Sequence, residues 1–150
     1  MDSELFRRTY REINERYCPF EKSLLTQHCQ CGRARRFCIA EREGVRCGSD
    51  AAQQRCVALL DLLGKNARFV LKVSQQKALP HGKALRVQVG GLRGLYSLLY
   101  PEKKPVEKIP DIDVLIECAI ARFGSLENLP FPAILGSIRA FQGRRPRRST

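Results

Sequence analysis

The sequence predicts a small, mostly helical α+β domain with a loop-rich cysteine lobe near its N-terminus and a short two-stranded element. One observation is that apolar residues recur at helical spacing in several segments of the 150-residue chain. A second is that six of its seven cysteines fall within residues 18–56, mostly in a stretch without a sustained hydrophobic period. We expect a single domain over residues 1–142, with the cysteine lobe at 18–56 and a basic helical part at 57–142. Residues 143–150 should form a disordered basic tail.

The first helix is predicted over Asp2–Tyr17, where apolar residues advance by four, three and four positions before Pro19. Residues 18–48 read as irregular, because they lack such a period and contain three glycines. A second helix should begin after Ser49, which is a favourable N-cap residue, and end near Gly64.

The rest of the chain is predicted to form two short strands followed by three helices. Ala67–Val73 and Ala84–Val89 read as two strands joined by a turn at residues 80–82. Three further helices are expected after them, at Leu92–Tyr100, Asp111–Phe123 and Pro132–Phe141.

The spacing of the cysteines indicates a thiolate-ligated metal centre. Zinc modules usually supply their ligands as closely spaced cysteine pairs such as CxxC, and this chain has no such pair. An iron–sulfur cluster tolerates looser spacing, because its thiolates bind different irons. We therefore expect a cluster, with zinc as the alternative metal. The predicted ligands are Cys18, Cys29, Cys31 and Cys38, with Cys47 as a substitute or fifth thiol.

Other roles for these thiols stay open at this point. Buried cysteine often behaves as a small hydrophobic residue, and a reactive thiol pair is a further alternative. Cys118 lies on a predicted apolar helix face, which favours packing, whereas Cys56 fits packing and ligation equally well. His28 and His81 are expected to be a solvated loop residue and a turn residue.

Glycines at positions 90, 91 and 94 follow a predicted strand and precede a predicted helix. Such a turn can bind an anion, but the pattern matches neither Walker A nor the full dinucleotide fingerprint. A tight turn with close helix packing is the favoured interpretation.

The charge is positive and uneven along the chain. Residues 1–56 contain 11 Lys or Arg and 8 Asp or Glu, whereas residues 57–150 contain 16 and 7, giving a net charge of +12. Without a nucleic-acid-binding motif, such a surface predicts at most non-specific contact with nucleic acid. An acidic protein partner would explain the charge equally well.

These observations predict a cytoplasmic accessory protein rather than an enzyme. The N-terminus is charged where an export signal would be apolar, and no segment is long and apolar enough to span a membrane. The motifs GxSxG and HExxH are both missing from the sequence. The predicted function is an iron–sulfur protein that transfers electrons to, or assembles, a partner enzyme. The alternative is a zinc-stabilised or metal-free basic module that binds nucleic acid or an acidic protein.

Overall fold

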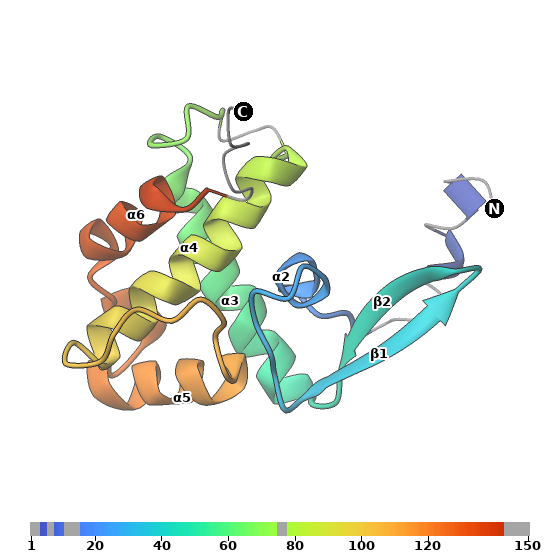
Figure 1. Ribbon diagram of the computed structural model, residues 1–150, viewed down its shortest axis with the longest axis horizontal. Helices are drawn as coiled ribbons and strands as arrows, with labels where there is room; N and C mark the ends of the chain where they lie inside the picture. Colours follow the sequence, from blue (N-terminus) through green and yellow to red (C-terminus); the bar gives the residue numbers. More distant parts are fainter. Residues whose placement is uncertain (1–3, 6–7, 11–15, 75–77, 143–150) are drawn as a thin grey trace, which may run out of the picture.

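The computed structural model describes residues 4–5, 8–10, 16–74 and 78–142. It contains a two-stranded antiparallel sheet beside a group of packed helices (Figure 1). This confirms the predicted mostly helical α+β class. The elements in chain order are α2 (Glu21–Leu25), β1 (Ala34–Ile39), β2 (Arg42–Cys47), α3 (Asp50–Ala67), α4 (His81–Leu99), α5 (Ile112–Phe123), a 3-10 turn (Leu126–Asn128) and α6 (Phe131–Ala140).

Close packing of α4 against α6 organises the helical part. A side chain at Gly90 would place its Cβ only 2.5 Å from the Ile138 Cα. At Gly91 the close neighbour is α3, because a Cβ there would lie 2.7 Å from a methyl carbon of Leu63. The glycines that suggested an anion-binding turn therefore lie inside a continuous helix and let its backbone approach two neighbours.

The predicted strands at 67–73 and 84–89 are wrong. Residues 84–89 belong to α4, which begins at His81 and runs through the region predicted as strand, turn and helix. Helix α3 also passes Gly64 and ends at Ala67. Alternating apolar residues in these segments reflect burial of α4 on several sides rather than a sheet face.

The two-stranded element is instead a hairpin inside the cysteine lobe. Strands β1 and β2 pair from Ala34 opposite Cys47 to Ile39 opposite Arg42, joined by a two-residue turn. Both turn residues have positive φ, 48° at Ala40 and 72° at Glu41. This is the backbone pattern of a type I′ turn, which normally selects Asn and Gly.

The chain just before the lobe lies along β2 and does not continue the predicted N-terminal helix. Residues 4–5 and 8–10 are helical, but Tyr17 forms an antiparallel bridge with Arg46. The Cys47 amide donates to the Arg16 carbonyl at 2.8 Å, and the Cys18 amide donates to the Val45 carbonyl at 3.1 Å. The segment at residues 16–18 therefore fixes Cys18 beside the end of β2.

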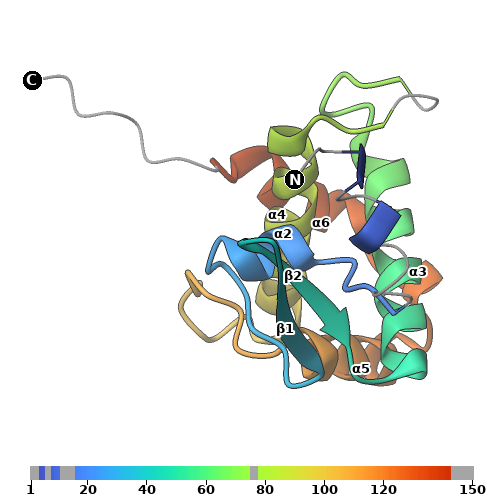
Figure 2. The same cartoon turned by 90° about the vertical axis from the view of Figure 1, so that its right-hand side faces the viewer.

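The lobe shares the hydrophobic core of the helices. Phe20 and Val45 are fully buried and belong to the same apolar cluster as Leu59, Leu92 and Ile116 of the helical part. Helix α2 lies between the hairpin and α4 (Figure 2). Within the described residues, no helix combines the length and apolar character that a membrane span requires. The predicted tail, residues 143–150, lies outside the described residues.

Candidate thiol site

Four cysteines from four segments line one small cavity. They are Cys18 before α2, Cys31 before β1, Cys47 at the end of β2 and Cys56 within α3. The remaining wall consists of Pro19, Phe20, Ala34, Ala52, Ile112 and Asp113. The cavity measures about 10 Å³, which is about the room of one water molecule.

Backbone geometry places each of these thiols. Cys31 precedes β1 in a turn closed by the Ala34 amide, which donates to the Cys31 carbonyl at 3.1 Å. Ala34 in turn pairs with Cys47 across the hairpin, so the strand register brings Cys31 near the end of β2. Ser49 caps α3 by accepting from the Ala52 amide at 3.2 Å. Ala52 and Cys56 lie one helical turn apart and share the face of α3 that lines the cavity.

Burial raises the pKa of three of these thiols, those of Cys18, Cys31 and Cys56. The pKa of Cys18 rises to about 12, mainly because burial disfavours its thiolate and also because Cys31 and Cys47 would place like charges beside it. Burial likewise raises the pKa of Cys56, with additional repulsion from Cys18, Cys31 and Cys47. Without a counter-charge these three thiols stay protonated, so they do not resemble an activated nucleophile. A bound cation is the usual agent that converts such thiols to thiolates.

The structure does not bring Cys29 and Cys38 to this cavity. The Cys29 side chain is 1% exposed in the main core, where its backbone forms a parallel bridge with Ile109. Cys38 is exposed on β1. Cys118 is partly buried on α5, and the Tyr100 hydroxyl lies 3.9 Å from its sulfur. Of the five predicted ligands, Cys18, Cys31 and Cys47 therefore meet, and Cys56 is the fourth thiol.

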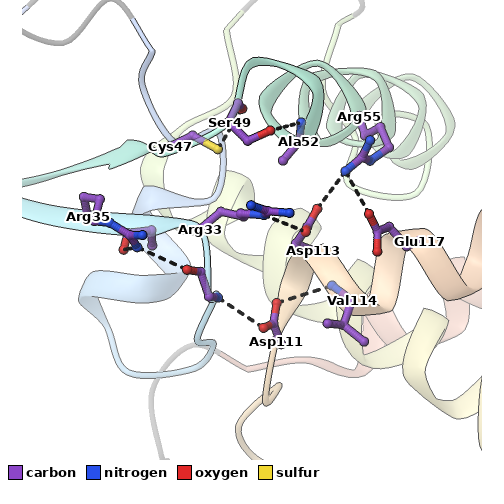
Figure 3. A network of polar contacts seen from close by, with 12 residues as sticks. Arg33, Arg35, Cys47, Ser49, Ala52, Arg55, Asp111, Asp113, Val114 and Glu117 are labelled. Atoms are coloured by element: carbon purple, nitrogen blue, oxygen red, sulfur yellow. Dashed lines mark hydrogen bonds and ion pairs between the residues drawn. The ribbon is translucent and has the colours of Figure 1, made fainter.

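A buried carboxylate in the cavity wall ties the lobe to the helices (Figure 3). The Asp113 side chain is 8% exposed and accepts from Arg33 Nε at 3.3 Å and from an Arg55 terminal nitrogen at 3.1 Å. The same Arg55 nitrogen reaches Glu117 at 3.2 Å. Arg33 comes from the turn before β1, Arg55 from α3 and Asp113 from α5, so one carboxylate joins three segments around the thiols.

Two further groups fix the loop that carries Cys31. Asp111 caps α5 by accepting from the Val114 amide at 3.3 Å, and its other oxygen accepts from the Gly32 amide at 3.2 Å. A Cβ at Gly32 would lie 2.9 Å from that carboxylate oxygen, which makes glycine necessary here. Arg35 donates to the carbonyls of Gly32 and Ala34 at 3.1 and 2.9 Å. Between Cys31 and Cys38, Arg33 therefore binds a carboxylate and Arg35 binds backbone carbonyls.

Two arginines of α4 donate to backbone carbonyls of neighbouring segments. Arg93 donates to the Glu107 carbonyl at 2.7 Å, and Arg86 donates to the Arg139 carbonyl at 2.8 Å. The His28 ring packs edge-on against Phe141 at 5.3 Å, and its Nδ1 lies 2.7 Å from the Thr26 hydroxyl. Burial, followed by repulsion from Arg93, lowers the pKa of His28. His81 is exposed at the first position of α4.

Neither similarity to known proteins nor the present arrangement of side chains assigns a chemical role to these residues. No family model, curated protein or solved structure matches this chain. In the part of the chain that the structure describes, no group of three or more His, Cys, Asp or Glu side chains could hold a metal ion as it stands. The four thiols thus line one cavity, but as they stand they do not form such a group.

Proposed function

We propose that this protein is a small metal-binding accessory protein with an iron–sulfur cluster ligated by Cys18, Cys31, Cys47 and Cys56. The observation that supports the proposal is the convergence of these four thiols, from four separate segments, on one cavity. Cysteine thiolates are the usual ligands of such clusters, and four of them complete a [4Fe–4S] centre.

Ligand spacing favours a cluster over zinc. A tetrahedral zinc ion with Zn–S bonds of about 2.3 Å requires sulfurs only about 3.8 Å apart. Zinc modules reach this arrangement with paired ligands on tight turns, whereas here 12, 15 and 8 residues separate the successive thiols. A cluster binds each thiolate at a different iron and accepts a wider arrangement.

The small cavity requires its lining to move when a cluster is bound. Cys18 and Cys31 lie outside the helices and Cys47 lies at a strand end. Binding a cluster would move these three outward around Cys56 on α3, against the hydrogen bonds that hold their segments. The cavity volume is the observation most favourable to zinc, which needs less room. For that reason the metal itself is measured in the test below.

Partner access is proposed at Cys31. This residue lines both the thiol cavity and an outer hollow of about 470 Å³ that also includes Gln30, Gly32, Arg36 and Asp111. A cluster ligated there would lie near the surface, where a partner enzyme could exchange an electron with it or receive it during assembly. The proposed setting is a reducing cytoplasm, which keeps unligated thiols from forming disulfides.

Metal analysis of protein purified without oxygen tests the proposal. We expect iron and acid-labile sulfide in equal amounts, with broad visible absorption from sulfide-to-iron charge transfer. The variant Cys56→Ser should lose most of this iron, because one ligand is removed, whereas Cys38→Ser and Cys118→Ser should retain it. Stoichiometric zinc in a colourless protein would replace the cluster with the zinc alternative.

Two other outcomes would overturn the assignment. Purified protein without iron or zinc would exclude a metal centre of either kind under these conditions. Equal iron loss from Cys38→Ser and Cys56→Ser would show that the four-thiol ligand set is wrong. Folding of each variant is checked by its helical circular dichroism, so metal loss is not confused with unfolding.

A further inference from the structure

A second, larger cavity lies between α2, α3 and α4. Its volume is about 660 Å³, within the range of about 300–1,000 Å³ that is typical of small-molecule sites. Cys18 and Pro19 belong to its wall as well as to the wall of the thiol cavity. Its apolar lining comes from Leu25, Val57, Leu60, Leu79, Ala84 and Val87.

A buried amide side chain lies in the wall of this larger cavity. Gln88 is 6% exposed, and its Oε1 accepts from the Ser23 hydroxyl at 2.8 Å. Among the described residues, no group accepts a hydrogen bond from the Nε2 of this amide. Because Gln88 lines the cavity, its Nε2 can donate a hydrogen bond to a ligand there in place of water.

The charged side chains around the same cavity favour an anion. Lys22, Lys65 and Arg68 contribute three positive charges, whereas Glu21 and Asp61 contribute the negative ones. Asp61 is paired with Lys65 at 3.6 Å. The Glu21 carboxylate accepts from the Tyr10 hydroxyl, and burial raises its pKa. The lining therefore carries three cations and two carboxylates, a formal excess of one positive charge at the cavity.

We propose that this cavity binds a small amphipathic organic anion, with its apolar body against α3 and α4 and a polar group on Gln88. The ligand class is a carboxylate on an apolar chain or ring, because the wall is mainly apolar and its cations are few. The site is independent of the metal centre proposed above, although a shared wall at Cys18 makes the two neighbours.

Calorimetric titration of the full chain with decanoate tests this proposal. We expect saturable binding, and at least about tenfold weaker binding of decylammonium, which has a chain of the same length with the opposite charge. The readout does not depend on iron, so its failure and the failure of the metal assignment are separable.

A pair of glycine variants locates the site. Gly64 lines the cavity, and a Cβ there would meet nothing within 4 Å, so Gly64→Leu should project into the cavity without disturbing α3. Gly136 on α6 also has open space and does not line this cavity, which makes Gly136→Leu the matched control. We expect Gly64→Leu to weaken decanoate binding at least about tenfold and Gly136→Leu to leave it unchanged.

Three results would overturn the proposal. The first is an absence of saturable decanoate binding, and the second is equal affinity for decanoate and decylammonium. The third is unchanged binding in Gly64→Leu whose circular dichroism matches that of the unsubstituted protein, because the ligand would then lie elsewhere.

Discussion

The hairpin lobe and the helical part of this protein are ordered by different forces. In the helical part, α4 lies so close to α6 that a Cβ at Gly90 would collide with backbone, and Gly91 leaves room for Leu63 of α3. The lobe shares the same apolar core through Phe20 and Val45, and in addition Asp111 and Asp113 of α5 and its cap hold the turn before β1. The hairpin projects to one side of the helices (Figures 1 and 2). The helical part thus rests on close packing, whereas the lobe combines packing with a few directed polar contacts.

This difference suggests where a ligand changes the protein most. Packing between helices is complete without a cofactor, because the glycine positions on α4 are filled by neighbouring backbone and side chains. Around the thiol cavity, hydrogen bonds and ion pairs hold the turn before β1 to α5 and α5 to α3. Ligation at the four thiols would add bonds in this region, so metal binding should stabilise the lobe more than the helices.

The largest effect is expected from overpacking the helical part. The variant Gly90→Val should destabilise the protein by about 3 kcal/mol or more, because its Cβ would lie 2.5 Å from backbone atoms of α6. Chemical denaturation measures this loss. Gly136→Ala is the control on α6, where a Cβ has open space, and it should be neutral or stabilising by up to about 1 kcal/mol. A small effect of Gly90→Val would show that α4 and α6 separate easily.

A smaller effect is expected where the two regions are joined. The variant Asp113→Ala should destabilise by about 2 kcal/mol, because it removes a buried carboxylate bonded to Arg33 and Arg55. Hydrogen exchange should locate the loss at the start of β1 and at α5. Asp61→Ala is the control, since it removes only an exposed pair with Lys65 and should cost less than about 0.5 kcal/mol. Equal losses in the two variants would contradict the joining role of Asp113.

The smallest expected effect is an increase in the stability of the hairpin. Replacing Ala40→Asn together with Glu41→Gly should stabilise the hairpin by about 1 kcal/mol, because both positions have positive φ that L-residues with a Cβ tolerate poorly. Slower amide exchange in β1 and β2 would measure the gain. Unchanged exchange would mean that the hairpin opens elsewhere than at its turn.

The same turn explains what the sequence could not predict. A hairpin is usually recognised by Asn-Gly or Asp-Gly between two alternating runs, but here the turn is Ala-Glu and the strands carry several arginines. Helices α3 and α5 were predicted well, because Ser49 and Asp111 are N-cap residues that accept from amides three positions later. The second half of α4 was predicted as the helix Leu92–Tyr100, but its first half was predicted as a turn and a strand, because this helix is buried on so many sides that its apolar period disappears.

The thiol site was predicted in part. Sequence spacing located the cysteine-rich segment, and the structure brings Cys18, Cys31 and Cys47 together. Cys29 and Cys31 are two residues apart but not equivalent, because the chain is extended at Cys29, which lies in the core beside Ile109, and turns at Cys31, which lines the thiol cavity. For Cys56 the sequence offered one signal, its position seven residues after the Ser49 cap on the same helix face as Ala52. That signal places Cys56 beside the other three thiols only when the hairpin register is known.

The short segment at residues 16–18 has a consequence for self-association. Because residues 16–18 bond to Val45 and Cys47, this end of the β2 edge is covered and offers less unpaired backbone to another chain. Within the described residues, the outer edge of β1 has no strand beside it. That open edge carries Arg35 and Arg36, and charged side chains on an edge strand oppose pairing with a second copy. Arg35 and Arg36 thus disfavour edge-to-edge aggregation of this protein, whichever partner it binds.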